Sequence, residues 1–269
     1  MTTTELKPEF YLERDMAAPD LLSFPEGKVV AYCRRCPGKE EPNDDSAAVI
    51  RTPFGGIVLA VADGVGGGPF GYKASAIAVQ VISDSLAGFE KSGDMRPAIL
   101  DGIEKANREI LDLGVGAATT LSVVEIQGGV ARAYQVGDSM ALMVGQRGAL
   151  KWKSTLHSPV GYAVESGLLD EREAMQHDER HLVSNLVGSR EMRIEIGPAQ
   201  LISPKDTVIV GSDGLFDNLH LDEVIQLGRI GKPIARVERL ANHASGRMAL
   251  SESQDLGKPD DLAVLLYTR

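Results

Sequence analysis

Four acidic motifs, each at or just past the end of an apolar strand-like run, constrain this chain more than any other feature. They are NDDS at 43–46, VADGVGGG at 61–68, VGSDGLFDN at 210–218 and KPDD at 258–261. A strand that ends in a bare carboxylate gains little from burial unless the carboxylate binds something. Because Mg²⁺ and Mn²⁺ prefer oxygen ligands of this type, the motifs predict a metal cluster assembled from distant segments.

The net charge narrows the classes of molecule that the protein is expected to bind. The 269 residues carry a net charge of −10, which argues against general binding to nucleic acids or anionic membranes, since both favour a basic surface. No apolar run approaches the roughly 18–20 residues of a transmembrane helix, and residues 1–25 contain no apolar stretch of a secretory signal. We therefore expect a monomeric cytoplasmic protein that binds neither nucleic acid nor membrane.

Hydrophobic periodicity divides the chain into blocks of strands separated by pairs of helices. Residues 1–25 are polar and contain three prolines, so we expect a loosely ordered N-terminal arm there and a single domain over 26–269. The predicted strands are at about 28–33, 47–52, 57–63, 194–202, 206–212 and 261–268. The predicted helices are at about 72–88, 97–113, 221–228 and 233–249.

Short strands with tight turns fill residues 117–153 and predict an antiparallel meander, with Gly128-Gly129 in a hairpin turn that needs positive φ. Strands outnumber helices, and regular β-α-β alternation is missing after residue 115. This combination favours an α+β sandwich in which two antiparallel sheets pack face to face and helices cover the outside.

A glycine-rich loop offers an alternative. Residues 66–71 satisfy G-x-G-x-x-G between a strand and a helix, and Glu90 follows at about the distance of a ribose-binding acid, as in dinucleotide-binding enzymes. Asp63 before the glycines would repel a pyrophosphate, and the antiparallel meander is not how such domains continue. Tyr72 stands where a nucleoside-triphosphate P-loop needs lysine.

Six motifs in the same order resemble those of the metal-dependent Ser/Thr protein phosphatases of type 2C (the PPM superfamily). They are Asn43-Asp44-Asp45-Ser46, Ala62-Asp63-Gly64-Val65-Gly66-Gly67, Ala118-Thr119-Thr120, Gly137-Asp138-Ser139, Ser212-Asp213-Gly214-Leu215-Phe216-Asp217 and Lys258-Pro259-Asp260-Asp261. The resemblance extends from about residue 28 to 269. It implies an αββα four-layer sandwich with two Mg²⁺ or Mn²⁺ ions at one edge of the sheets.

The resemblance also implies a role for each acidic residue. Asp63 would bridge both metals, and the Gly64 carbonyl would bind the first. Asp213 and Asp260 would hold the second metal, and Asp45 would contact metal-bound water. Asp45 and Asp63 are therefore the expected catalytic residues.

Two further acids complete this expected set. Asp138 aligns with the acid that holds a third, weaker metal in many bacterial members of the family. Asp44 occupies a position where some members place a ligating Glu, but its side chain is shorter. Plain alternatives exist for these residues: an Asx turn at 43–46, a hairpin cap at Asp138, paired turn residues at 260–261 and a helix cap at Asp217.

The expected reaction follows from the two metals. A water that bridges two divalent cations about 3.5–4 Å apart loses its proton near neutral pH and attacks phosphorus in line. The cations also neutralise the phosphoryl oxygens. We thus expect a hydroxide-based phosphoprotein phosphatase that acts on phosphoserine and phosphothreonine opposite a partner Ser/Thr kinase.

The chain departs from the family pattern at several positions. The Arg that grips the substrate phosphate in many members is missing, and only Lys39, Arg35 or Arg34 stand near its place. This gap motivates an alternative, an inactive regulatory binding protein on the same fold. Val65 replaces a candidate acid His, and His157 is expected to be structural. The Cys33/Cys36 pair lacks the further ligands of a zinc site and is also expected to be structural or incidental.

Overall fold

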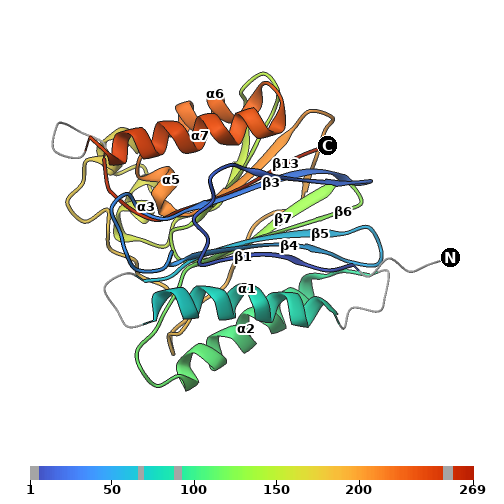
Figure 1. Cartoon of the computed structure of the whole chain (residues 1–269), viewed down its shortest axis with the longest axis horizontal. Coiled ribbons are helices and arrows are strands. Elements are labelled where there is room, and N and C mark those ends of the chain that lie inside the picture. Colours follow the sequence, from blue (N-terminus) through green and yellow to red (C-terminus); the bar gives the residue numbers. More distant parts are fainter. Residues whose placement is uncertain (1–5, 66–69, 88–92, 251–256) are drawn as a thin grey trace.

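A four-layer sandwich forms the body of the protein (Figure 1). The computed structural model describes residues 6–65, 70–87, 93–250 and 257–269. Two sheets face each other, and every strand pair in them is antiparallel. The predicted α+β sandwich of two antiparallel sheets flanked by helices is confirmed. The doubly wound parallel sheet of a dinucleotide-binding domain is excluded.

The first sheet contains, in spatial order, β1 (Glu9–Leu12), β4 (Asp45–Arg51), β5 (Ile57–Asp63), β6 (Leu121–Gln127) and β7 (Val130–Val136), with β10 (Glu195–Ile196) and β11 (Gln200–Leu201) both paired to β7. The second sheet contains β2 (Asp20–Phe24), β3 (Gly27–Arg34), β13 (Leu262–Thr268), β12 (Thr207–Gly211), β8 (Met140–Val144) and β9 (Leu150–Lys153).

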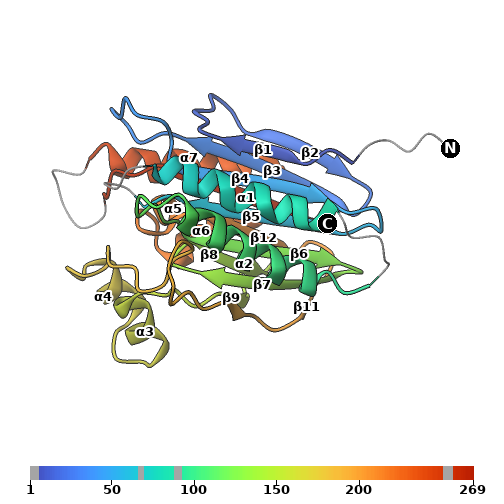
Figure 2. The ribbon, with the colours of Figure 1, turned by 90° about the horizontal axis from the view of Figure 1, so that it is seen from below.

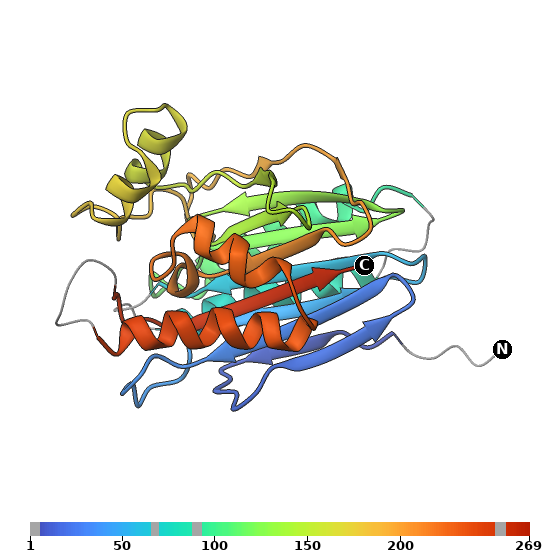
Figure 3. The same ribbon diagram turned by 90° about the horizontal axis from the view of Figure 1, so that it is seen from above.

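Helices cover the outer face of each sheet. The first sheet is covered by α1 (Gly71–Ala87) and α2 (Arg96–Asp112), and the second by α5 (Asp213–Phe216), α6 (Leu221–Arg229) and α7 (Pro233–Met248) (Figures 1 and 3). Two short helices, α3 (Pro159–Glu165) and α4 (Glu171–Met175), project from one end of the sandwich (Figure 2). None of the described helices is long and apolar enough to cross a membrane.

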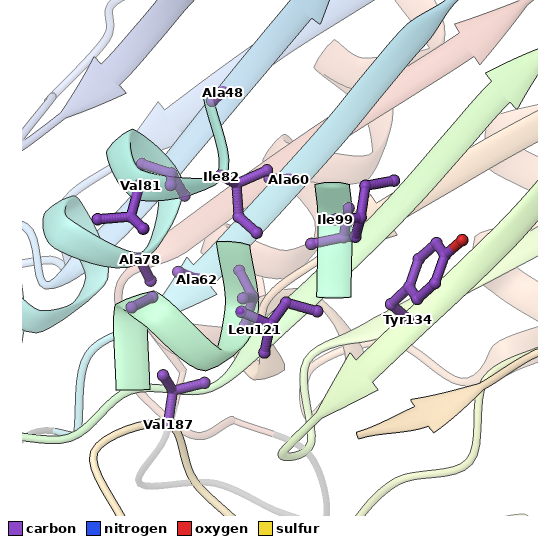
Figure 4. Close-up of a cluster of buried hydrophobic side chains, with 14 of the residues drawn as sticks. Ala48, Ala60, Ala62, Ala78, Val81, Ile82, Ile99, Leu121, Tyr134 and Val187 are labelled. Carbon is purple, nitrogen blue, oxygen red and sulfur yellow. The ribbon is translucent and has the colours of Figure 1, made fainter. Parts of the chain in front are cut away.

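Both faces of the central strands are buried, which explains why the sequences of these strands are continuous apolar runs. In β5, Val58, Ala60 and Ala62 face α1 and α2, where they meet Ile82 and Ile99 (Figure 4). The alternate residues of β5 face the second sheet and join the core between the sheets. A third apolar cluster lies between the second sheet and helices α5 to α7.

The expectation of a loosely ordered N-terminal arm is wrong for residues 6–25, the described part of that segment. Strand β1 pairs with β4, and β2 pairs with β3, so this segment adds an edge strand to each sheet. Tyr11 reaches the core between the sheets, whereas Phe10 and Leu12 pack against the helix side. Polar neighbours and prolines hid this short alternation. We propose a single domain that includes both strands.

The expected meander is divided between the two sheets. Strands β6 and β7 form a hairpin in the first sheet, with Gly128 and Gly129 at positive φ, and β8 and β9 form a hairpin in the second. Residues 137–139 therefore cross from one sheet to the other. Periodicity identifies strands but not their partners, so the sequence could not show this crossing.

The dinucleotide-binding alternative was based on the glycine-rich loop and on Glu90. Residues 66–69 of this loop and Glu90 lie outside the described residues.

Candidate metal centre

Antiparallel pairing brings the acidic motifs to one edge of the sandwich. Asp45 opens β4 and lies directly opposite Asp63, which closes β5. Asp213 follows β12 and Asp260 precedes β13, and these two strands pair with Gly211 opposite Val264. The expectation that each aspartate follows a strand is wrong for Asp45 and Asp260. The start of one antiparallel strand lies beside the end of its neighbour, so all four still meet.

Ser212 links the two sheets at this edge. Its hydroxyl donates a 2.6 Å hydrogen bond to Asp45 Oδ2 and accepts one of 3.0 Å from the backbone N–H of Ala263. Asp45 is only 1% exposed, so this hydroxyl is an essential partner for its carboxylate. Sequence reasoning named the Ser212 motif but missed this role.

Two threonines fix the backbone of Asp63. The Asp63 N–H donates to Thr120 Oγ1 at 3.1 Å, and Thr119 Oγ1 donates to the Asp63 carbonyl at 2.7 Å. Thr120 Oγ1 also lies 2.6 Å from the hydroxyl of Ser139, which belongs to the segment that crosses between the sheets. The motifs at 118–120 and 137–139 therefore brace the residue expected to bridge the metals.

Glycine follows aspartate in two motifs because another backbone passes too close for a side chain. A Cβ at Gly64 would overlap the carbonyl of Gly71, and one at Gly214 would overlap the carbonyl of Asp261. Neither residue has a positive φ, so the requirement is space and not conformation. These contacts hold Asp63 and Asp213 at the edge.

The carboxylates are close enough to raise one another's pKa. Burial first, and then the charges of Asp213 and Asp45, raise the pKa of Asp63 well above its ordinary value. Burial also raises the pKa of Asp45, opposed by the Ser212 hydrogen bond. Burial and the charge of Asp213 raise the pKa of Asp260 to about 7. Such a cluster favours a bound cation, because like charges this close cannot all ionise alone.

Lys258 supplies a cation within the cluster. Its Nζ contacts Asp213 Oδ2 and lies 3.0 Å from Asp217 Oδ2 and 3.2 Å from Asp260 Oδ2. Although burial opposes its charge, the carboxylates raise the pKa of Lys258 above its ordinary value. No signal in the sequence singled out this lysine beyond its place in the KPDD motif.

The donor chemistry of this edge fits a divalent metal. Asp213 Oδ1 is buried, and no hydrogen-bond partner is found for it among the described residues. Within that same part of the chain, however, no three His, Cys, Asp or Glu side chains are arranged to hold an ion. The carboxylates of Asp213 and Asp260 instead converge on Lys258.

The sequence model of the protein phosphatase 2C family matches residues 34–252 of the chain. The chain belongs to the protein phosphatase 2C family. Protein phosphatase PhpP of Streptococcus pneumoniae is 26% identical over 205 residues, which cover 71% of this chain and 82% of PhpP. The structure of the S. agalactiae serine/threonine phosphatase is similar with a TM-score of 0.76 at 26% identity, covering 89% of this chain and 98% of that one.

A second solved structure carries metal. The catalytic domain of the serine/threonine protein phosphatase PstP, in complex with two manganese ions, is similar with a TM-score of 0.70 at 20% identity. The match covers 89% of this chain and 96% of the PstP domain. At this identity the likeness shows that the two chains share the fold.

Asp138 lies at the same edge in this phosphatase 2C chain. It is 9% exposed, and burial followed by the charges of Asp213 and Asp217 raises its pKa. Its neighbour Gly137 donates a backbone hydrogen bond of 3.2 Å to Nδ1 of His157. The pKa of His157 is lowered by burial, and the ring stacks on Tyr162. His157 thus has the contacts of a structural residue that supports the crossing segment.

A second lysine pairs with the remaining acids. Lys39 Nζ lies 2.7 Å from Asp44 Oδ2 and 2.6 Å from Asp261 Oδ2. Asp261 also accepts hydrogen bonds from the backbone N–H groups of Asp44 and Cys36. Asp44 is therefore engaged with Lys39, and Lys39 is held by two carboxylates rather than extended as a replacement for the missing Arg.

Among the described residues, the two cysteines and the other two candidate cations, Arg34 and Arg35, have no contacts that indicate a catalytic or binding role. Cys33 is buried in the core between the sheets, and both cysteines are free thiols. Arg35 lies 3.7 Å from Asp15 and donates to the carbonyl of Glu40. Arg34 ends β3 and is exposed.

A cavity of about 100 Å³ adjoins the acidic edge. Asp138, Asp213 and Asp217 line it, and α3 and α4 contribute residues such as Val160 and Ala174. The other lining residues include the apolar side chains of Met140, Leu156, Val164, Met175, Phe216, Leu219 and Leu221 and the charged side chains of Lys153, Glu165, Glu171 and Arg180. The lining is therefore mainly apolar with charged side chains of both signs, and the cavity shares Asp138 and Asp213 with the candidate metal centre.

Proposed function

We propose that the protein is a metal-dependent phosphoprotein phosphatase that hydrolyses phosphoserine and phosphothreonine. The observation that carries this proposal is the convergence of Asp45, Asp63, Asp213 and Asp260 from four distant segments at one edge of the sandwich. Membership of the protein phosphatase 2C family supports it, as do the names of the relatives. The alternative of an inactive binding protein rests on the missing Arg alone, and no observation favours it.

Two Mg²⁺ or Mn²⁺ ions would be held as the family pattern implies, and the two manganese ions of the PstP domain support this number. Asp63 would contact both ions, with the Gly64 carbonyl on the first and Asp213 and Asp260 on the second. Asp138 would hold a third, weaker ion. When bound, such ions lower the pKa of water and neutralise charge on phosphoryl oxygens.

The chain's own residues prepare this centre. Ser212 orients the buried carboxylate of Asp45, and Thr119 and Thr120 hold the backbone of Asp63. Because these partners are fixed before substrate arrives, little reorganisation is needed during the reaction.

The cavity beside Asp213 and Asp217 favours a peptide substrate over a small phosphate ester. Its largely apolar lining beside the acidic edge suits a side chain next to the phosphorylated residue, which a small phosphate ester lacks. We infer that a phosphoprotein binds with its phosphate at the acidic edge and an adjacent small apolar residue in the cavity. A Ser/Thr kinase would produce this substrate, and the cytoplasmic location and monomeric state stay predictions.

Phosphate release from a phosphothreonine peptide tests the proposal. We expect turnover with Mn²⁺, none with EDTA, and a loss of at least about 10²-fold in the Asp63→Asn variant. The matched control is Asp84→Asn, which removes an exposed carboxylate from α1 and should leave turnover unchanged. Turnover that survives chelation would contradict the proposed function.

A further inference from the structure

Lys258 has no role in the family pattern described above, yet it occupies the centre of the acidic edge. We propose that its ammonium group occupies the second of the two cation positions and that a divalent ion must displace it to bind there. This inference rests on the proposed function, because it concerns the metal that Asp213 and Asp260 would hold.

The contacts of the ammonium group carry the inference. Lys258 Nζ contacts Asp213 Oδ2 and lies 3.2 Å from Asp260 Oδ2, and these carboxylates are the two expected ligands of the second metal. An ammonium group has three donors, and a third carboxylate, Asp217, lies 3.0 Å away. An ion held by both carboxylates would lie between them, where the ammonium group lies, and two like charges repel each other strongly at such a distance.

The backbone of Lys258 is fixed, so this placement is built into the fold. The Lys258 N–H donates to Asn218 Oδ1 at 3.1 Å, and Asn218 Nδ2 donates to the Lys258 carbonyl at 2.9 Å. Asn218 is fully buried and also donates to the carbonyl of Gly214, next to Asp213. One buried amide therefore fixes the distance between the lysine and the carboxylate it contacts.

Asp217 offers the ammonium group a place to remain when a metal arrives. Asp217 is not among the expected metal ligands, whereas Asp213 and Asp260 are. Rotation of the flexible lysine side chain can keep the Asp217 contact and release the other two. Lys258 thus acts as an internal counterion that stabilises the carboxylate cluster when no metal is bound. It weakens binding of the second ion and leaves the ligands of the first ion unchanged.

Calorimetric titration of the full chain with MnCl₂ tests this directly. The Lys258→Met variant keeps an unbranched side chain without the charge. We expect it to bind the second Mn²⁺ about tenfold tighter than the natural protein, within the 10–100-fold range by which neighbouring groups change metal affinity. Lys39→Met is the matched control, since it removes an equally paired ammonium from Asp44 and Asp261, and its second-ion affinity should change much less.

Thermal unfolding gives a second readout that does not depend on activity. Without metal, Lys258→Met should unfold at a lower temperature than the natural protein, because its carboxylates lose their counterion. Saturating Mn²⁺ should remove most of this difference. If Lys258→Met does not fold without metal, Asp217→Asn supplies the test: it should weaken second-ion binding, because the displaced ammonium loses its alternative partner.

The outcomes separate this inference from the proposed function. Two bound ions with equal affinities in the natural protein and in Lys258→Met, or an unchanged second affinity in Asp217→Asn, would overturn the role of Lys258 alone. No bound Mn²⁺ in the natural protein, together with no Mn²⁺-dependent phosphate release, would overturn the proposed function.

Discussion

Asp45 and Asp63 lie directly opposite each other on the antiparallel strands β4 and β5. One opens its strand and the other closes its own, so the pairing places two carboxylates side by side at a sheet edge. Strands β12 and β13 repeat the arrangement in the second sheet with Asp213 and Asp260. The face-to-face packing of the sheets then unites the two pairs, with Ser212 as the hydrogen-bonded link between them.

Ser212→Ala should destabilise the protein. The substitution leaves the buried Asp45 carboxylate and the Ala263 N–H without this partner, at a cost of about 1–3 kcal/mol in the free energy of unfolding. Ser85→Ala is the control, because the Ser85 hydroxyl donates to the carbonyl of Val81 within its own helix α1. Denaturant unfolding of both variants checks the prediction, and equal effects would contradict the linking role of Ser212.

Two glycine substitutions should act in opposite directions. At Gly214 a methyl group overlaps the Asp261 carbonyl, so Gly214→Ala should lower the free energy of unfolding by at least about 1–3 kcal/mol. Gly246 lies within α7 with open space around it, so Gly246→Ala should raise the free energy of unfolding by roughly 0.5–1 kcal/mol. Denaturant midpoints measure both, and a tolerated Gly214→Ala would show that the two backbones are not in close approach.

The metal-free protein should lose stability as the pH rises through 6 to 7. Asp217 and Asp260 have pKa values raised to about 6 and about 7 in the folded protein, against 3.8 for an ordinary Asp. The folded state therefore keeps these protons to a higher pH than the unfolded chain, and that contribution is complete below pH 3.8 and lost through pH 6–7.

Melting temperatures in EDTA at pH 5 and pH 8 check this sign. The decrease between the two should be smaller in Asp260→Asn than in the natural protein, because the variant has no proton to lose. Mn²⁺ affinity should rise over the same pH window, since the carboxylates must be deprotonated to bind metal. An identical decrease in both proteins would contradict the assignment of the effect to Asp260.

Filling the cavity should impair peptide substrates selectively. Ala174→Phe places a ring in the cavity, and kcat/KM for a phosphothreonine peptide with an adjacent Val should fall by about tenfold. Hydrolysis of p-nitrophenyl phosphate should be unchanged, because this ester has no side chain to place there. Gln176→Phe adds the same ring just beyond α4 at an exposed position outside the lining. Equal losses on both substrates would contradict the peptide subsite.

The sequence predicted what is local and what is strongly periodic. Helices α1 and α2 lie within one residue of their expected bounds, because apolar residues recur there at helical spacing. The short strands β1 and β2 were missed, since four or five residues beside prolines carry too little periodicity to be recognised. The division of the expected meander between two sheets depends on tertiary pairing, which no local pattern encodes.

The acidic residues of the candidate site could be predicted from the sequence, but the positions of its lysines could not. Aspartates in D-G motifs after buried strands signal a cation site, and the structure brings them together. Their roles as individual ligands remain predictions. The positions of Lys258 and Lys39 could not be foreseen, because a lysine in a loop is usually solvated and only the folded chain shows the carboxylates around it.

Anomalous scattering from a crystal soaked in MnCl₂ tests the central claim most directly. The account predicts one manganese peak in contact with the Asp63 carboxylate and a second between Asp213 and Asp260, with the Lys258 ammonium withdrawn toward Asp217. No manganese peak in contact with Asp63 at saturating MnCl₂ would contradict it.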